Sequence, residues 1–84
     1  MSMIGWYQVI KMATYRERMR SLREDSDLTQ AELGKILNKS QQGYNHIEAG
    51  RAELKIDDLA ILCRFYNVSA DYLIGLIDKK KTYK

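Results

Sequence analysis

The sequence contains no proline, a single cysteine and no long hydrophobic run. Proline interrupts helices and marks sharp turns, so its absence favours a helical fold. Cys63 alone cannot form an intramolecular disulfide, and it lies in an apolar run, so it is predicted to pack as a small hydrophobic residue. No apolar stretch approaches the roughly 20 residues that span a bilayer, and residues 1–13 lack the features of a secretion signal. We therefore expect a cytoplasmic protein with no membrane partner.

The chain also lacks a net positive charge outside its C-terminus. The formal net charge is +3, but residues 1–77 carry ten basic and ten acidic side chains. The excess comes from residues 78–84, a short basic tail of a kind that is usually solvated and can add non-specific contacts to phosphates. The 84 residues suffice for one small domain. We predict an N-terminal extension at 1–13, a domain at 14–77 and the tail at 78–84.

The sequence contains no combination of side chains with the spacing that a catalytic or metal-binding site requires. One histidine, His46, and one cysteine, far apart in sequence, do not form a metal site. Asp57 and Asp58 are adjacent and do not face each other on a helix, so they are better explained as acids at a helix start. The chain has no Ser/His/Asp set and no phosphate-binding loop. We predict that it is not an enzyme and needs no cofactor.

What the chain does contain is apolar residues at helical spacing, which predict five helices and an all-α fold. The first covers residues 14–25, with Tyr15, Met19 and Leu22 on one face. The third covers residues 41–48 and ends at Gly50. The fourth has an inward stripe formed by Ile56, Leu59, Leu62, Cys63 and Tyr66. The short fifth is capped by Ser69 and directs Leu73 inward, which leaves Tyr72, Leu76 and Ile77 without an assigned place in the core.

The second and third helices are joined by a sharp turn. The second begins at Thr29, which forms a T-x-x-E capping box with Glu32, and ends at Asn38, a residue that tolerates the left-handed conformation. Ser40 is a good N-cap for the third helix. The third helix crosses closely over the second, and Gly34 supplies the small residue that this contact requires. These features predict a helix-turn-helix.

The outer face of the third helix is unusual for a chain in which 30% of the residues are charged. It carries amides and a histidine in place of the expected lysines and glutamates. An amide can donate and accept hydrogen bonds together, as the edge of an adenine requires. This row consists of Gln41, Gln42, Asn45 and His46.

Residues 15–76 resemble the Cro/C1-type (XRE-like) helix-turn-helix family of phage repressors and bacterial regulators. The matching stretches are LTQAELGKIL, SQQGYNHIEAGR and IDDLAILCRFYNVSADYL. The chain departs from the family at Gly34, where alanine is commoner, at Tyr44, where most members carry isoleucine or valine, and at Leu54, where many have proline. Gly43 within the third helix is unfavourable for helix stability but permits close approach to DNA.

The resemblance implies a five-helix lambda-repressor-like domain that binds double-stranded DNA, and it implies roles for individual residues. Base contacts are expected from Gln41, Gln42, Asn45 and His46. Phosphate contacts are expected from Gln30, Lys39, Ser40 and Arg51. Arg23 and Glu48 match the family's structural ion pair. The predicted function is that of a transcriptional repressor or regulator that binds DNA as a homodimer. The dimer interface is expected to be formed by Tyr72, Leu76 and Ile77, with Trp6 and Val9 as further candidates.

Two alternatives stay open. The same fold serves as a protein-interaction module, such as an antirepressor or the toxin-binding part of an antitoxin, and the surface would then be Trp6, Tyr7, Val9 and Ile10. Residues 3–12 fit either a strand or a helix, and their β-branched and aromatic residues favour an extended segment or arm. Met12 is also a plausible true start, immediately before the first helix.

Overall fold

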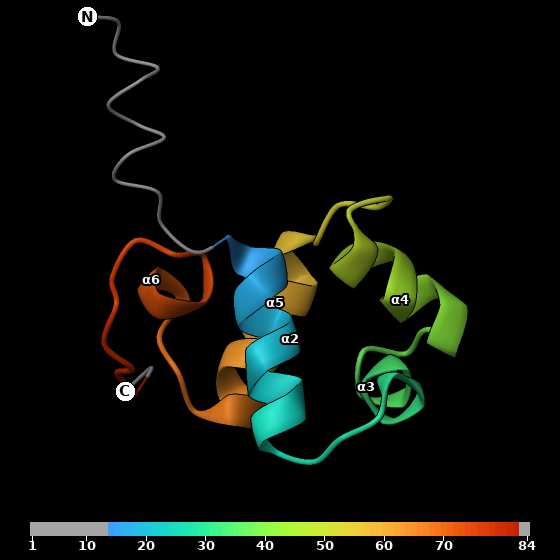
Figure 1. The fold of residues 1–84 in the computed structure, drawn as a ribbon, viewed down its shortest axis with the longest axis horizontal. Helices are drawn as coiled ribbons and strands as arrows, with labels where there is room; N and C mark the ends of the chain where they lie inside the picture. Colours follow the sequence, from blue (N-terminus) through green and yellow to red (C-terminus); the bar gives the residue numbers. More distant parts are fainter. Residues whose placement is uncertain (1–13, 83–84) are drawn as a thin grey trace, which may run out of the picture.

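The computed structural model describes residues 14–82, and this part of the chain contains five helices and no strand (Figure 1). The all-α prediction is confirmed. No helix in it is long and apolar enough to cross a membrane. The expectations for residues 1–13, whether strand, arm or interaction surface, lie outside the described residues, as do the last two residues of the tail. The helices are α2 Tyr15–Asp25, α3 Gln30–Ile36, α4 Gln41–Ala49, α5 Ile56–Tyr66 and α6 Ala70–Leu73.

Side-chain caps define where the helices begin. Thr29 accepts a hydrogen bond from the backbone of Glu32, whose own side chain accepts one from Thr29, so the predicted capping box is present. Ser40 and Ser69 cap α4 and α6 as expected. A second capping box, between Thr14 and Glu17, opens α2 and was not predicted although its T-x-x-E pattern is the same.

The helices end where the sequence permits a left-handed residue. Asn38 adopts φ 57° in the turn after α3, and Gly50 adopts φ 89° at the end of α4. Both stops were predicted. Asn67 does the same at the end of α5, with φ 54°. The turns after α3 and α5 thereby bring α3 against α4 and α5 against α6.

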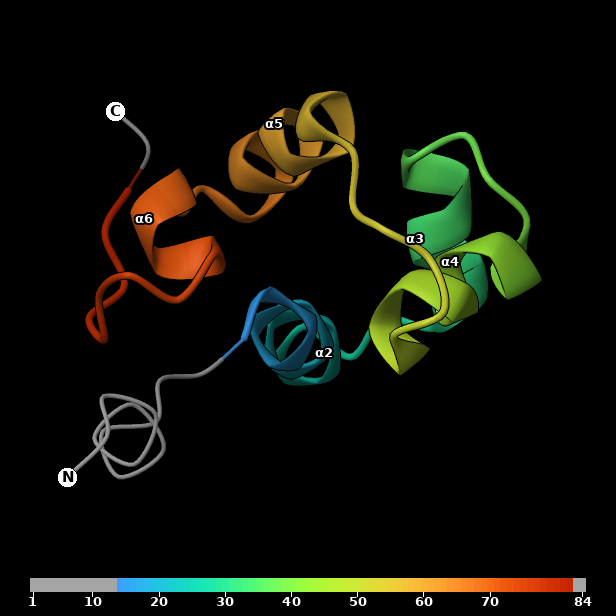
Figure 2. The same ribbon diagram turned by 90° about the horizontal axis from the view of Figure 1, so that it is seen from above.

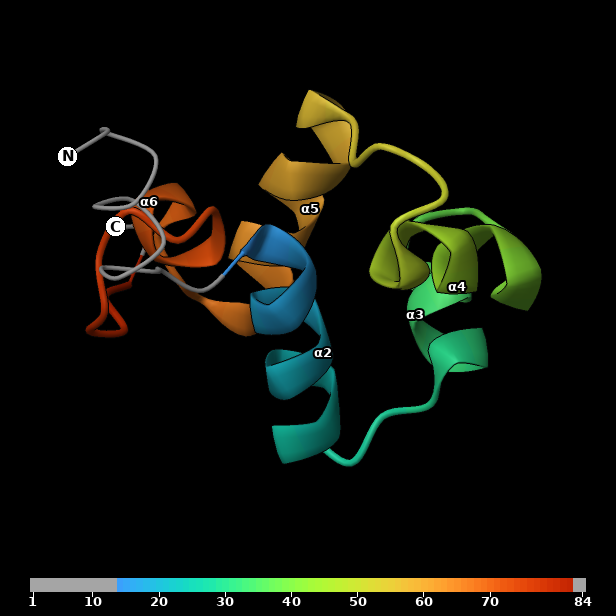
Figure 3. The same ribbon diagram turned by 45° about the horizontal axis from the view of Figure 1, so that its top comes forward.

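Helix α2 runs through the middle of the molecule, with α3 and α4 on one side and α6 on the other (Figures 1 and 2). Figures 2 and 3 show α5 between α6 and the α3–α4 pair, and in Figure 2 it lies opposite α2. The core draws on every helix and on Val68, and its largest fully buried side chains are Tyr44, Met19, Leu33, Leu62 and Leu73. Because Tyr44 and Ile47 are buried, the opposite face of α4 is left free.

Two expectations about packing were wrong. Ile56 was expected on the inward stripe of α5 but is 76% exposed, because the first turn of α5 extends past the core that Leu62 and Cys63 enter. Tyr72 was left without a place, yet it packs against the core. The guanidinium of Arg18, itself buried, lies 4.0 Å from the centre of the Tyr72 ring.

The backbone of the basic tail is attached to the domain. Asp78 lies 3.5 Å from the Arg18 guanidinium, and the Ser69 amide donates a hydrogen bond of 2.6 Å to the Lys81 carbonyl oxygen. All the described tail residues, 78–82, are nevertheless exposed to solvent. The described part of the tail is therefore exposed, as the sequence suggested, while its backbone also contacts the start of α6, which the sequence did not indicate.

Gly34 lies where α3 meets the turn that leads into α4. A Cβ atom at this position would be 2.8 Å from the Lys39 carbonyl oxygen and 3.0 Å from that of Ser40. Both atoms belong to the backbone, so they cannot swing aside. The glycine thus permits the close approach that the sequence predicted, and it fixes how tightly the two helices pack.

We expect Gly34→Ala to destabilise the domain by about 1–3 kcal/mol, because the steric conflict outweighs the ~1 kcal/mol gain in helix propensity. Thermal unfolding followed by circular dichroism measures the effect. Gly43→Ala is the matched control, since a Cβ there would meet chiefly the Ser40 hydroxyl at 3.3 Å. The control is expected to change stability by less than about 1 kcal/mol. Equal effects of the two substitutions would contradict the packing argument.

Candidate nucleic-acid interface

The exposed face of α4 presents the polar row that the sequence predicted. Gln41 and Gln42 are exposed, and Asn45 and His46 are half-buried one turn further along the helix. The row follows from helical periodicity, because Tyr44 and Ile47 occupy the inward positions between these residues. The structure thus places all four predicted base-contact residues on one accessible side of a single helix.

The beginnings of α3 and α4 line an open recess of about 490 Å³ whose lining residues are all polar. Gln30 contributes from α3, and the other lining residues come from α4 and its cap. Five of the eight residues assigned to base or phosphate contacts therefore meet at one surface feature. They are Gln30, Ser40, Gln41, Gln42 and Asn45.

Side-chain hydrogen bonds connect α3 to α4 beneath this recess. The Asn45 amide donates to the Gln30 side-chain oxygen at 3.1 Å, and the Gln30 amide donates to a Glu48 oxygen at 3.3 Å. Each amide retains a donor or acceptor beyond these two hydrogen bonds. The orientation of Asn45 and Gln30 is consequently set from the interior of the protein.

Glu48 is the buried end of this chain of hydrogen bonds. Its side chain is 4% exposed and forms a two-point ion pair with Arg23 of α2, with distances of 2.8 and 3.1 Å. Arg23 also donates to the Leu28 carbonyl oxygen. The predicted structural pairing of Arg23 with Glu48 is therefore present in the described structure, and it joins α2 to α4.

The environment of Glu48 changes its acidity. Burial acts to raise the pKa of the carboxyl group, but hydrogen bonds from Arg23 and Gln30 and the neighbouring Tyr44 hydroxyl outweigh it, so the pKa of Glu48 lies below its ordinary value. The same pairing raises the pKa of Arg23 above its ordinary value. Both groups are therefore charged at neutral pH.

The residues expected to contact phosphates differ in how freely they can do so. Arg51 is exposed just after α4. The Ser40 hydroxyl is exposed but already accepts the Gly43 amide as the helix cap. Lys39 lies 3.2 Å from Asp58 of α5, and its side chain is only 25% exposed. The sequence did not predict this last pairing, because the two residues are far apart and belong to no periodic pattern.

Arg16 is a second residue that the sequence did not assign. Its guanidinium donates to the carbonyl oxygens of Ile47 and Ala52. These carbonyls lie in the last turn of α4 and just after it, and that of Ile47 also accepts from the amide of the C-cap Gly50. Arg16 therefore anchors the C-terminal end of α4, as Ser40 caps its beginning.

Comparison with known proteins agrees with this geometry. The chain belongs to the helix-turn-helix family, whose model matches residues 19–73, and the resemblance to its Cro/C1-type members is confirmed. It is 38% identical over 64 residues to an uncharacterised HTH-type transcriptional regulator of Bacillus subtilis (strain 168), YobD. The match covers 76% of this chain but only 57% of that relative. No solved structure shows a significant match.

The ion pair predicts an acid-sensitive contribution to stability. A carboxyl group whose pKa is lower in the folded state stabilises the protein above its unfolded pKa of about 4.3, and this stabilisation is lost as the pH falls through the folded value. Glu48→Gln is expected to lower the free energy of unfolding at pH 7 by about 1–3 kcal/mol. The difference in unfolding free energy between the variant and the original protein should become smaller below about pH 4.

Urea unfolding between pH 7 and pH 3 measures this difference. The control is Glu24→Gln, which removes a carboxylate from an exposed pair with Arg20, in which the side chains are 66% and 60% exposed. Exposed pairs of this type contribute about 0–1 kcal/mol. If the difference in unfolding free energy between Glu48→Gln and the original protein does not vary with pH, the lowered pKa of Glu48 in the folded protein is contradicted.

Proposed function

We propose that the protein binds double-stranded DNA sequence-specifically and regulates transcription, most simply as a repressor, with α4 inserted in the major groove. The observation that carries this proposal is the accessible row of amides on α4, held in a helix-turn-helix by interior hydrogen bonds. A major groove about 12 Å wide admits one helix, and the N-terminal residues of the recognition helix then meet the base edges.

Gln41 and Gln42 are the first residues of α4 and its most exposed polar pair. A glutamine side chain can bond N6 and N7 of adenine at once, which is worth about 1–3 kcal/mol of discrimination. Asn45 and His46 follow one turn later and would reach bases deeper in the site. Asn45 is held by Gln30, so its reach is narrower than that of the two free glutamines.

The flanking phosphates would be contacted by Gln30, Ser40, Arg51 and Lys39. In the helix-turn-helix geometry these positions surround the row on α4, and phosphate contacts fix the register of a protein on the duplex. Arg51 is the most available cation among them, because Lys39 is already paired with Asp58. Removing the Lys39 side chain would disturb both that pair and any phosphate contact.

Gln41→Ala and Gln42→Ala are each expected to relax the preference at one or two positions of each half-site, by about 1–3 kcal/mol. Folding should be unaffected because both side chains are exposed. Selection of bound fragments from a random pool of duplex DNA measures the preference, and a thermal melt checks the fold. Unchanged preferences in both variants would refute the assignment.

Arg51→Ala is the contrasting variant in the same experiment. Loss of a phosphate contact weakens binding to all sequences and reduces the slope of log affinity against log salt by about one, without altering the preferred sequence. If the original protein shows no salt-dependent binding to any duplex, DNA binding itself is refuted.

We also propose that the protein binds DNA as a homodimer. One module offers few base contacts, and two half-sites about 34 Å apart double them. The exposed apolar residues after α6 supply a surface for self-association, since Leu76 is 61% exposed and Ile74 is 41% exposed. Sedimentation on a palindromic duplex should show two protein chains per duplex, and Leu76→Glu should reduce the complex to one. A single chain bound by the original protein would refute the dimer.

A further inference from the structure

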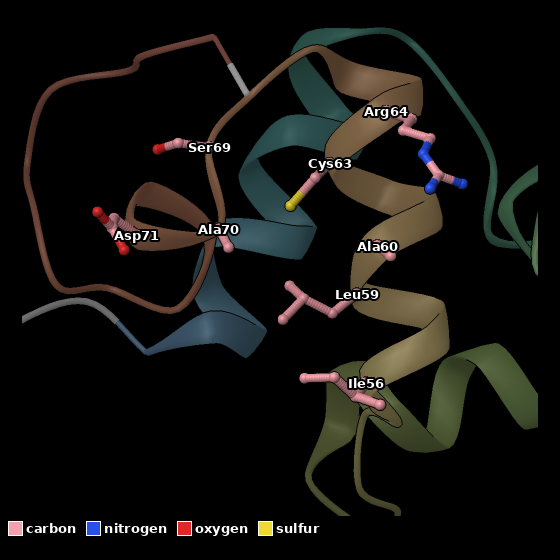
Figure 4. A pocket seen from close by; sticks show the side chains of 8 residues that line it. All are labelled: Ile56, Leu59, Ala60, Cys63, Arg64, Ser69, Ala70 and Asp71. Carbon is pink, nitrogen blue, oxygen red and sulfur yellow. The ribbon is translucent and has the colours of Figure 1, made fainter. Parts of the chain in front are cut away.

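Two hollows on the described surface are similar in size but differ in chemistry. The groove of about 420 Å³ between α5 and α6 has an apolar lining that includes Leu59, Ala60 and Cys63 (Figure 4). The recess of about 490 Å³ at the beginnings of α3 and α4 has only polar lining residues. A group that enters this recess is recognised by hydrogen bonds, so the positions of its donors and acceptors decide which group fits.

The direction of the hydrogen bonds beneath the recess is set by Glu48. Its side chain is 4% exposed and is paired with Arg23, so the ionised carboxylate can only accept hydrogen bonds. The Gln30 amide nitrogen Nε2 donates to Glu48 Oε1 at 3.3 Å. The reverse orientation of the Gln30 amide would place its oxygen against a buried carboxylate, with no hydrogen between the two acceptors. The buried charge therefore selects one of the two orientations of this amide.

The orientation of Gln30 in turn determines that of Asn45. Because Nε2 of Gln30 is directed to Glu48, its oxygen Oε1 is free to accept from Asn45 Nδ2, at 3.1 Å. An Asn45 amide turned the other way would again place two oxygens together. Asn45 therefore directs Nδ2 to α3, and its carbonyl oxygen Oδ1 takes no part in this chain of hydrogen bonds. What Asn45 retains is an acceptor, Oδ1, and one hydrogen of Nδ2.

An acceptor held in this way is complementary to a donor on the edge of a base. In the major groove the donors are the N6 amino group of adenine and the N4 amino group of cytosine, whereas guanine N7 and O6 and thymine O4 are acceptors. Asn45 lines the recess together with Gln41 and Gln42. Those two glutamines make no side-chain hydrogen bond within residues 14–82, so they can present either end of their amides. Asn45 differs from them in having its polarity fixed.

We propose that Gln30 is a positioning residue for Asn45, and that Asn45 consequently reads the amino group of an adenine or a cytosine. This inference rests on the proposed binding of DNA by α4, and it adds the chemical group that is read and the residue that selects it. The second hydrogen of Gln30 Nε2 remains available to a phosphate oxygen. The two roles of Gln30 have different effects, because a phosphate contact carries no sequence information and the positioning of a base-reading amide does.

The hydrogen bond between Asn45 and Gln30 is measurable without DNA, from the exchange of side-chain amide hydrogens with water in NMR spectra. Asn45 Nδ2 is expected to exchange about 2- to 12-fold more slowly than the amide of the exposed Gln41. Gln30→Met preserves the length of the side chain but removes the amide, so it should abolish this difference and leave Gln41 unchanged. Equal exchange of Asn45 and Gln41 in the original protein would refute the positioning role.

Duplexes that lack one amino group test the base contact. Selection from a random pool first identifies the base pair whose preference is lost in Asn45→Ala. At this pair, adenine is replaced by 2-aminopurine, or cytosine by 2-pyrimidinone; both analogues still pair but lack the amino group in the major groove. The replacement is expected to weaken binding of the original protein by about 2- to 12-fold and that of Asn45→Ala not at all. Gln30→Met should show a smaller loss than the original protein, because its Asn45 amide is free to turn.

Arg51→Ala is the matched control, since it removes an expected phosphate contact and leaves Gln30 and Asn45 in place. It should weaken binding to every duplex but retain the full loss of affinity when the amino group is removed. If Gln30→Met behaves in the same way as Arg51→Ala, Gln30 contacts a phosphate only and the positioning role is refuted.

Failure of this inference can be distinguished from failure of DNA binding itself. If the original protein binds a defined sequence and removal of the amino group has no effect, DNA binding stands and the readout of an amino group is refuted. If the original protein binds no duplex, the readout is refuted together with DNA binding, and the exchange measurement still decides whether Gln30 holds Asn45. Should Gln30→Met fail to fold, the original protein and Asn45→Ala still decide whether the amino group is read.

Discussion

The arrangement of the helix-turn-helix depends on one buried carboxylate. Glu48 is 4% exposed, and a charge so far from water is stable only if its partners are fixed in place. Those partners come from two other helices: Arg23 of α2 provides two hydrogen bonds, and Gln30 of α3 provides a third. Any rotation of α4 relative to α2 or α3 would leave the carboxylate without compensation. The ion pair therefore determines the orientation of α4 more specifically than the apolar contacts of Tyr44 and Ile47, which tolerate small shifts.

Other interactions restrain α4 at its two ends. Ser40 caps the first turn, Arg16 binds the carbonyl oxygens at and beyond the last turn, and Gly34 permits the turn between α3 and α4 to close tightly. The position of α4 is thus fixed by the Glu48 ion pair on its buried face and by interactions at both of its ends, so its accessible face is held in a defined orientation. A recognition surface benefits from such rigidity, because side chains already held in position lose less entropy when they bind. Within the row, Asn45 is restrained through Gln30, whereas Gln41 and Gln42 are free to adjust.

The local features of this fold could be predicted from the sequence, and many of its long-range contacts could not. Capping residues act on amides three positions away, so Thr29, Ser40 and Ser69 were recognisable, as were the left-handed stops at Asn38 and Gly50. The pairing of Arg23 with Glu48 was expected only through the family resemblance. Nothing in the residue pattern indicated that Arg16, Arg18 and Lys39 bind partners 19 to 60 positions away. Long charged side chains reach such partners in directions that helical periodicity does not describe. Ile56 was misplaced for a related reason, because periodicity gives the face of a helix but not where the core ends along it.

The use of basic side chains inside the fold bears on how the proposed interface would discriminate. Arg16, Arg18, Arg20, Arg23 and Lys39 all lie in ion pairs with acidic residues of the same domain. These cations are largely neutralised before any DNA approaches, and residues 1–77 carry no net charge. Affinity for DNA of arbitrary sequence rises with the number of phosphates that are neutralised, so the described surface would bind such DNA weakly. Sequence preference is the ratio of specific to non-specific affinity, and a low non-specific affinity raises that ratio. Under the proposed function, a neutral domain that presents amides in place of lysines would be suited to discriminate between sequences more than to bind tightly, and the tail lysines would supply the remaining attraction to the duplex.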